Sequence, residues 1–250
     1  ATLFDGKTLA GWKVMEEDDL AQHGKVRVDE DRIVLERGNK RTGIAWAGEF
    51  PKVDYEIALE ARREAGEDCF CDVYFPIGSS LCSLAVGAWG GDMVGLSCVD
   101  GQWAPDNGTG RRLPLQTGRW YSVRLRVTQA KVQVWIDDQK VVDLSRAGRT
   151  FSPPSEHKNI TWFLASWETT AGLRNIRMQL LESQPEPPPA DGTPLDTAAV
   201  AVSAATGWAD TGLYLDKGKP YPISATGRWG VRHDWTQGPE GWPGEARAWL

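Results

Sequence analysis

Apolar and polar side chains alternate along much of residues 1–182, in short runs separated by Gly, Asp and Asn. Alternation with a period of two is the signature of a strand with one buried face. The clearest hairpin combines residues 120–127 with residues 131–136, and no long run of helical periodicity interrupts the series. Many short strands at regular spacing predict an antiparallel β-sandwich or barrel.

The stretch from residue 55 to residue 75 gives the sharpest functional hint. Its two alternating runs predict a hairpin whose polar turn is centred on Gly66. Facing residues of paired antiparallel strands project from the same side of the sheet. The polar face predicted in this way carries two carboxylates, an arginine and a tyrosine, namely Glu60, Asp72, Arg62 and Tyr74.

In this register Glu60 faces Asp72 directly, and like charges in that position are unfavourable unless something uses or neutralises them. One interpretation is a catalytic pair, because glycosidases commonly use two carboxyl groups. The other is an ordinary polar surface on which Arg62 neutralises one carboxylate. The pattern leaves both interpretations open.

Four cysteines, at positions 69, 71, 82 and 98, fit none of the usual zinc spacings, and the three histidines are scattered. The expected turns place Cys82 opposite both Cys71 and Cys98 on neighbouring strands. We expect small buried hydrophobic residues here. A Cys71–Cys82 or Cys82–Cys98 disulfide is the alternative, although cross-strand geometry is often unsuited to disulfides.

Tryptophan is the compositional outlier, with 13 copies in 250 residues. Its flat apolar faces suit sugar rings as well as protein cores. The candidates for sugar binding are Tyr74 on the polar face and the tryptophans Trp89, Trp103, Trp135 and Trp167. The net charge of −6 argues against a nucleic-acid partner. No apolar run approaches the length of a membrane span.

Residues 100–112 form a long polar loop of a composition that often carries binding function. Asp100, Asp106 and Asn107 could ligate calcium through oxygen atoms, but turn chemistry explains them better. We therefore expect no cofactor, with a structural calcium ion as the alternative. Asn107 and Asn159 also begin sequons for N-glycosylation in form.

A composition change divides the chain after residue 182. Residues 183–196 are proline-rich and predict a semi-rigid linker. Residues 197–250 contain short strand-like runs, but about 54 residues are few for an all-β domain without disulfides or metal. We expect this second unit to be truncated, or completed by packing on the first. The start at Ala1, without Met, indicates a trimmed, processed or recombinant form.

The opening LFDGKTLAGW resembles the start of a bacterial family known as DUF1080, or 3-keto-disaccharide hydrolase domains. The likeness continues through YEIALEAR, through GRWYSVRLRV and VQVWIDDQKVVD, and through SWETTAGLRNIRMQLL, covering nearly all of residues 1–182. It implies a concanavalin-like antiparallel β-sandwich whose concave face handles sugars, in an extracytoplasmic bacterial protein. Less specifically, residues 197–250 resemble the first half of calcium-dependent galactose-binding bacterial lectins.

The resemblance also bears on individual residues. Glu60 and Arg62 sit where the family tends to place an acidic and a basic residue on a central strand. The next two motifs depart from the family pattern, because FCDVYFPIG replaces an Asn-Ser-Gly-Ile type motif and LAVGAWGGDMVGLS replaces a motif with further polar site residues.

Three hypotheses for function follow. The first is a hydrolase or lyase that acts on glycosides, including 3-keto-glycosides, whose ketone acidifies the neighbouring C–H. Glu60 would then be the base, Arg62 would stabilise the oxyanion, and Asp72 would tune the protonation of Glu60. The second is a non-catalytic carbohydrate-binding module that uses the same face. The third is a structural or cell-surface adhesion segment.

Overall fold

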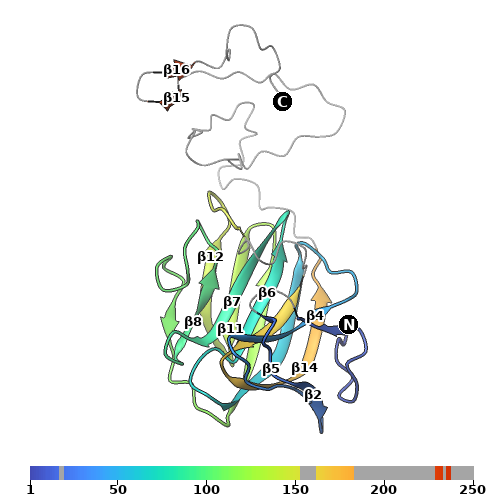
Figure 1. Ribbon diagram of the computed structural model, residues 1–250. Helices are drawn as coiled ribbons and strands as arrows, with labels where there is room; N and C mark the ends of the chain where they lie inside the picture. Colours follow the sequence, from blue (N-terminus) through green and yellow to red (C-terminus); the bar gives the residue numbers. More distant parts are fainter. Residues whose placement is uncertain (17–19, 153–161, 183–228, 233–234, 238–250) are drawn as a thin grey trace. The chain divides into compact units, whose positions relative to one another are not determined.

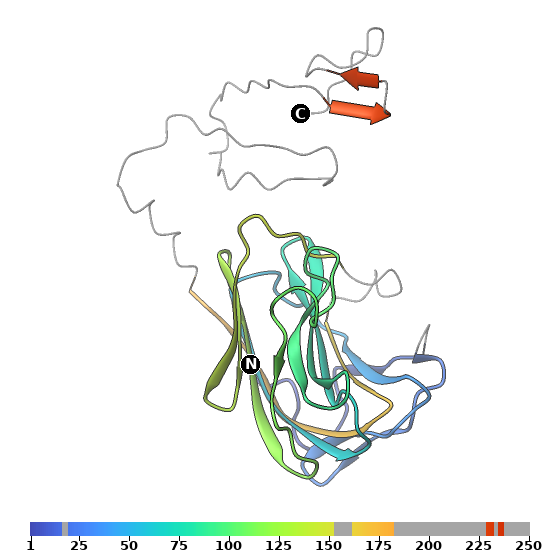
Figure 2. The same ribbon diagram turned by 90° about the vertical axis from the view of Figure 1, so that its left-hand side faces the viewer.

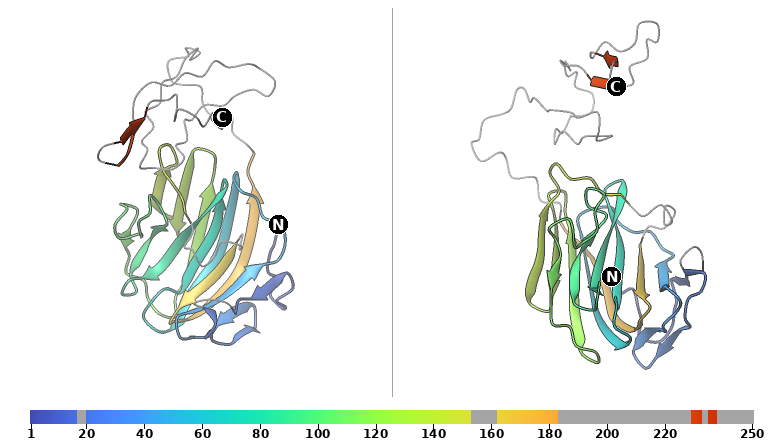
Figure 3. Two further views of the ribbon diagram at one scale, coloured as in Figure 1. Left: turned by 45° about the horizontal axis from the view of Figure 1, so that its top comes forward. Right: turned by 60° about the vertical axis from the view of Figure 1, so that its left-hand side comes forward.

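The computed structural model describes residues 1–16, 20–152, 162–182, 229–232 and 235–237. The chain divides into two compact units, Ala1–Pro187 and Pro188–Leu250. Within the described part of the first unit, strands form two seven-stranded antiparallel sheets that pack face to face as a sandwich (Figure 1). Figures 2 and 3 show the two layers from other directions. The prediction of an antiparallel β-sandwich is confirmed.

We call the two layers the β6 sheet and the β5 sheet, after their central strands. The β6 sheet runs in the order β1 (Trp12–Val14), β4 (Arg41–Trp46), β13 (Phe163–Trp167), β6 (Cys71–Ile77), β7 (Ser80–Ala88), β8 (Met93–Ser97) and β9 (Arg111–Arg112). The β5 sheet runs in the order β12 (Gln139–Ser145), β11 (Lys131–Ile136), β10 (Trp120–Val127), β5 (Tyr55–Ala65), β14 (Thr170–Leu180), β3 (Arg32–Leu35) and β2 (Val26–Asp29).

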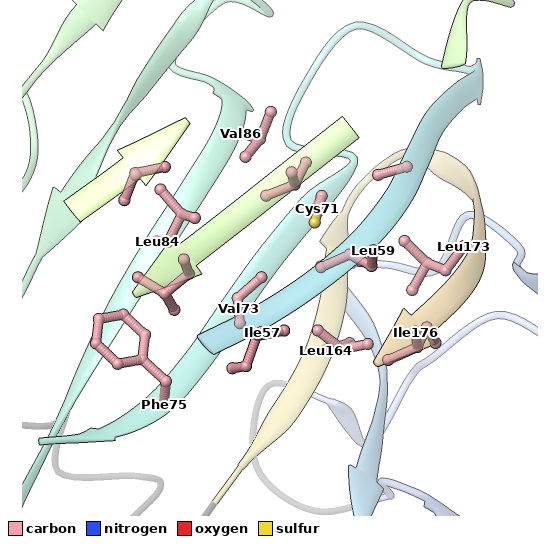
Figure 4. Packing of buried hydrophobic residues seen from close by; sticks show 14 of the residues in the cluster. Ile57, Leu59, Cys71, Val73, Phe75, Leu84, Val86, Leu164, Leu173 and Ile176 are labelled. Atoms are coloured by element: carbon pink, nitrogen blue, oxygen red, sulfur yellow. The ribbon is translucent and has the colours of Figure 1, made fainter. Parts of the chain in front are cut away.

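The core lies between the two sheets and is built from the apolar half of each alternating strand. Ile57 and Leu59 of β5 pack in one buried cluster with Cys71 and Val73 of β6 (Figure 4). Each fully buried aliphatic side chain contributes about 1.5–3 kcal/mol relative to an exposed one. The polar half of each strand is thereby directed to an outer face, which is where a functional site can form.

The expected hairpin across residues 55–75 is wrong. β5 pairs with β10 and β14, whereas β6 pairs with β13 and β7, so the chain crosses from one sheet to the other around Gly66. The apolar faces of the two strands meet across the core instead of lying side by side. A hairpin and a crossover between packed sheets produce the same alternation, because both bury one face of each strand.

The expected row of facing cysteines is wrong between Cys71 and Cys82. The pairing of β7 with β8, in which Ser83 lies opposite Ser97, has the offset that was expected for Cys82 and Cys98. Cys71 lies opposite Val86, and Cys82 lies opposite Phe75. All four cysteines are nonetheless buried free thiols, which confirms the expectation of small buried hydrophobic residues. Burial raises the pKa of each of these thiols.

The hairpin predicted from residues 120–136 is confirmed by the pairing of β10 with β11. Val123 and Leu125 point into the core with Ile136 and Val134 opposite them. In the second unit, β15 (Trp229–Arg232) and β16 (Trp235–Gln237) form a two-stranded antiparallel sheet. The linker predicted at residues 183–196 and the Asn159 sequon lie outside the described residues. In the part of the chain that the structure describes, no helix has the length and apolar character needed to cross a membrane.

Candidate functional site

A pocket of about 360 Å³ opens on the outer face of the β6 sheet. Its lining combines one arginine, two carboxylates and three tryptophans, namely Arg41, Asp68, Asp72, Trp89, Trp103 and Trp167. Small side chains complete the lining, including Ser83, Ala85 and Ser97. Charged groups and flat aromatic faces are the two kinds of surface that recognise sugar rings, by hydrogen bonding and by stacking.

The floor of the pocket is a row of small residues with Asp72 at its centre. The register pairs Asp72 with Ala165 of β13 on one side and with Ala85 of β7 on the other. Beyond them, Gly43 pairs with Ala165, and Gly95 pairs with Ala85. Because its neighbours in this row carry at most a methyl group, the Asp72 carboxylate stands in a hollow.

Arg41 forms an ion pair with Asp72 on this floor. Its Nη2 lies 3.3 Å from Oδ2 of Asp72, and the two side chains are only 12% and 7% exposed. The guanidinium also lies over two rings, 5.0 Å from the centre of Trp167 and 5.4 Å from that of Tyr74. The arginine is thus held between the carboxylate and two aromatic rings on the floor of the pocket.

Tyr74 follows Asp72 on the same face of β6, as its place in the alternation predicts. Its ring is buried and stacks on Phe163, with ring centres 4.0 Å apart. Both rings belong to a small cluster with Met15 and Leu20. Tyr74 does not line the pocket. The predicted substrate contact is therefore replaced by a supporting role beneath Arg41.

Trp89 reaches the pocket from the connection between β7 and β8. The residue adopts a left-handed backbone conformation, with φ of 47°, and remains 40% exposed. Trp103 comes from the loop that follows β8 and is 50% exposed. Trp89 and Trp103 thus bring two large, exposed aromatic side chains to the same pocket, and that they bind substrate stays a prediction.

The loop that carries Trp103 is fastened to β8 by short contacts. The backbone N–H of Ala104 donates to Oγ of Ser97, and the Asn107 amide donates to a backbone carbonyl of the same strand. Gly95 permits this close approach, since a Cβ there would lie 2.9 Å from the Cβ of Ala104. The loop thus holds Ala104 against the sheet and leaves Trp103 at the pocket.

The polar residues considered as calcium ligands have other contacts. Oδ1 of Asn107 accepts hydrogen bonds from the backbone N–H and the hydroxyl of Thr109. The carboxylate of Asp100 accepts from the backbone N–H of Thr150 and from Arg149. Among the residues described, no group of three His, Cys, Asp or Glu side chains is arranged to hold a metal ion.

Glu60 does not share a face with Asp72. It lies on the outer face of the β5 sheet, where its carboxylate accepts hydrogen bonds from Nε of Arg174 at 2.7 Å and from Nδ2 of Asn175 at 3.0 Å. The two carboxylates therefore belong to different sheets and to opposite outer faces of the sandwich. The geometry on which the predicted catalytic pair rested is wrong.

Arg62 and Trp135 also lie on the outer face of the β5 sheet. Nη2 of Arg62 donates to Glu64 at 2.6 Å, and its guanidinium lies 4.5 Å from the ring centre of Trp120. The Trp135 ring lies beneath the guanidinium of Arg124 at 4.0 Å. The structure therefore separates Arg62 and Trp135 from the pocket that contains Asp72, Trp89, Trp103 and Trp167.

The pocket contains two charged residues that no sequence pattern indicated as site residues, namely Arg41 and Asp68. Arg41 opens β4, and its alternation with Gly43 places both on the outer face. Asp68 belongs to the connection between β5 and β6, where polar residues suggested only a solvated turn. Alternation identifies Arg41 as outward-facing. Its closeness to Asp72 depends on β13, which lies about 120 residues after Arg41 and about ninety residues after Asp72 in the sequence.

Comparison with solved structures finds similar proteins. The exoplasmic/lumenal domain of VIP36, in its Ca²⁺/Man3GlcNAc-bound form, has a TM-score of 0.53 at 9% identity, covering 74% of this chain and 90% of that one. A Bacillus subtilis protein of unknown function with a galectin-like fold has a TM-score of 0.50 at 10% identity, covering 70% and 92%. The carbohydrate-binding module CBM66 from Bacillus subtilis has a TM-score of 0.47 at 13% identity, covering 72% and 99%.

No curated protein matches the sequence. Residues 1–179 match the family described as the 3-keto-alpha-glucoside-1,2-lyase-like domain, which is the family that the sequence motifs indicated. The match covers nearly the whole sandwich, including every residue of the pocket. It supports a carbohydrate-related function. The chain therefore belongs to the family of 3-keto-alpha-glucoside-1,2-lyase-like domains.

Proposed function

We propose that the pocket around Asp72 binds a glycoside oxidised at C3 and cleaves its glycosidic bond by elimination. The observation that carries this proposal is the Arg41–Asp72 ion pair on the floor of a pocket lined by tryptophans. Membership of the 3-keto-alpha-glucoside-1,2-lyase-like family supports the same substrate class.

A ketone at C3 makes the hydrogen on C2 acidic, so a carboxylate can remove it as a proton. The electron pair of that C–H bond then forms an enolate, whose negative charge rests on the C3 oxygen. When the enolate collapses, C1 and C2 become doubly bonded and the bond from C1 to the leaving oxygen breaks. The leaving oxygen takes up a proton, which completes the balance.

The three charged residues of the pocket suit these steps. The carboxylate of Asp72 stands in the hollow where a sugar ring would lie, held there by its ion pair with Arg41, and it is the candidate base. Arg41 also supplies the positive charge that stabilises an enolate oxygen. Asp68, the second carboxyl group of the pocket, can donate a proton to the leaving oxygen.

The test compares 3-keto-glucosides with their unoxidised parents and measures the sugar released. Asp72→Asn should lower the turnover of the keto substrates by about 10²–10⁴-fold, the usual contribution of a general base. Glu60→Gln is the matched control, because Glu60 lies on the opposite outer face. Unchanged turnover in folded Asp72→Asn, or loss of turnover in folded Glu60→Gln, would contradict the proposal.

The role of Asp68 can be tested separately through the leaving group. Asp68→Asn should slow the release of an alcohol, which needs a proton as it departs. It should affect a nitrophenolate leaving group much less, because that group departs without protonation. An equal loss with both leaving groups would remove Asp68 from the role of acid.

A second candidate function is a non-catalytic carbohydrate-binding module. The same ion pair favours it, because Arg41 already occupies the carboxylate that an enzyme would use as a base. A binding module would retain glycan affinity without forming any product. In that case Asp72→Asn would weaken glycan affinity. The unmodified protein would turn over neither the 3-keto-glucosides nor their unoxidised parents.

A further inference from the structure

Arg63 projects into the sandwich near the end of β5 and is only 5% exposed. Its guanidinium donates to three backbone carbonyls. Nε donates to Asp68 at 3.2 Å, and Nη2 donates to Gly87 at 3.3 Å and to Gly91 at 2.5 Å. Within the described residues, no carboxylate forms an ion pair with Arg63. Burying a cation has a large desolvation cost, and carbonyl groups without a carboxylate offset only part of it.

The local backbone is shaped to receive this guanidinium. A Cβ on Gly87 would lie 2.6 Å from Nη2 of Arg63, and a Cβ on Gly91 would lie 2.7 Å from the backbone oxygen of Glu67. Both glycines have positive φ, at 78° and 91°, which other residues rarely adopt. The ring of Phe70 closes the arrangement, 5.1 Å from the guanidinium.

The three carbonyls lie in, or directly beside, the two connections that bring Asp68 and Trp89 to the pocket. The connection between β5 and β6 carries Asp68. The connection between β7 and β8 carries Trp89 and Gly91, and Gly87 lies two residues before Trp89, near the end of β7. Arg63 is therefore bonded to the backbone at Asp68 and to the backbone on both sides of Trp89.

We propose that Arg63 is a positioning residue that fixes Asp68 and Trp89 relative to each other and thereby sets the affinity of the pocket for its glycoside. The inference rests on the proposed function for its kinetic consequence. Its structural consequence, the placement of Trp89, is independent of any substrate. The Asp68 carboxylate and the Trp89 ring must hold a fixed spacing if one is to reach the leaving oxygen of the glycoside while the other stacks on its sugar ring.

The first measurement needs no substrate. The indole N–H signal of Trp89, assigned by its loss in Trp89→Phe, reports the position of this connection in a ¹H–¹⁵N spectrum. Arg63→Met should shift that signal and leave the signal of Trp135 in place. The matched control is Arg62→Met, which removes the neighbouring arginine from the opposite side of the same strand and should leave Trp89 unmoved.

The second measurement uses the 3-keto-glucoside that the unmodified protein turns over best. Arg63→Met should raise KM by about tenfold, the equivalent of one lost contact of about 1.4 kcal/mol, with a smaller change in kcat. Arg63→Lys keeps a cation that can bind some of the three carbonyls, so it should recover part of the affinity. A uniform fall in the amount of active protein, with KM unchanged, would contradict a positioning role.

If Arg63→Met does not fold, Gly87→Ala tests the same arrangement without removing the charge. The added methyl group would press on the guanidinium and on Phe70, so it should displace Trp89 and raise KM. An unshifted Trp89 signal with unchanged KM in folded Arg63→Met or Gly87→Ala overturns the proposal. If the protein turns over no 3-keto-glucoside, the proposed function fails, while the Trp89 signal still decides whether Arg63 positions the connection.

Discussion

The guanidinium of Arg41 lies 3.3 Å from the carboxylate of Asp72, although a whole strand, β13, separates their two strands. The residue of β13 that pairs with Asp72 is Ala165, and its partner on β4 is Gly43. Small residues at these two positions let an arginine side chain extend over the intervening strand. On the other side of Asp72 the neighbouring residue, Ala85, is also small, and this creates the hollow.

Ala85→Leu should therefore fill the pocket. Ala85 lies beside Asp72 and is 5% exposed, so the larger side chain would occupy the hollow where a sugar ring is expected. We expect glycan affinity to fall at least tenfold, or about 1.4 kcal/mol, by calorimetry. Ala58→Leu is the control, because Ala58 lies on the outer face of the β5 sheet. Wild-type affinity in Ala85→Leu would show that the ligand binds elsewhere.

Trp103→Ala and Trp135→Ala should separate the two outer faces. Trp103 is half exposed at the pocket, so its removal should lower glycan affinity by about 1–2 kcal/mol while changing the free energy of unfolding by no more than about 0.5 kcal/mol. Trp135 lies beneath Arg124 on the other sheet, so its removal should cost about 0.5–1 kcal/mol of stability and no affinity. Titration with a glycan measures the affinity, and urea unfolding measures the free energy of unfolding. The reverse pattern would place the binding face on the β5 sheet.

The alternation of side chains was enough to predict the β-sandwich and to place Asp72 and Tyr74 on one outer face. It was not enough to place Glu60, because the partner of a strand depends on contacts between distant parts of the chain. β5 and β6 are neighbours in sequence, yet their buried faces meet across the core. A short polar connection is compatible with a hairpin and with a crossover between sheets, and its composition does not distinguish them.

The tryptophans also differ in how far the sequence alone could predict their location. Trp89 and Trp103 lie in connections, where an exposed aromatic side chain is a departure from ordinary loop composition and so points to binding. Trp135 alternates with core residues on a strand, and only the sheet order shows which outer face it occupies. Arg41 became a site residue because of its register with β13, and no local pattern contains that information.

The four cysteines should be unreactive in the folded protein. Burial, followed by the nearby charge of Asp72, raises the pKa of Cys98 to about 12, so few thiolates form near neutral pH. We expect slow alkylation by iodoacetamide at pH 8 in the native protein and four alkylated thiols after denaturation, counted by mass spectrometry. Rapid labelling of native Cys71, which is 1% exposed, would contradict this placement.

The same shift predicts a loss of stability at alkaline pH. The thiol pKa values are higher in the folded protein than in the unfolded chain, so their contribution is complete below about pH 8.5 and declines as the pH rises further. Between about pH 9 and pH 10, each buried thiol should lower the free energy of unfolding by about 1.4 kcal/mol per pH unit. Cys71→Ala should reduce that slope by the contribution of one group, as measured by urea unfolding at several pH values. An unchanged slope would show that Cys71 does not titrate differently in the two states.

Asp100→Asn should lower the free energy of unfolding more at neutral pH than at acid pH. Partial burial raises the pKa of Asp100, but the hydrogen bonds from Thr150 and Arg149 outweigh this effect and hold the pKa below its ordinary value. A carboxyl group with a lowered pKa stabilises the fold above the pKa of the unfolded chain and loses that effect as the pH falls through the folded value. The substitution should therefore cost about 1 kcal/mol at pH 7 and progressively less below about pH 4. Asp138→Asn, at an exposed turn, is the control in urea unfolding, and an equal cost of Asp100→Asn at pH 7 and pH 3 would show that the charge of Asp100 does not stabilise the loop.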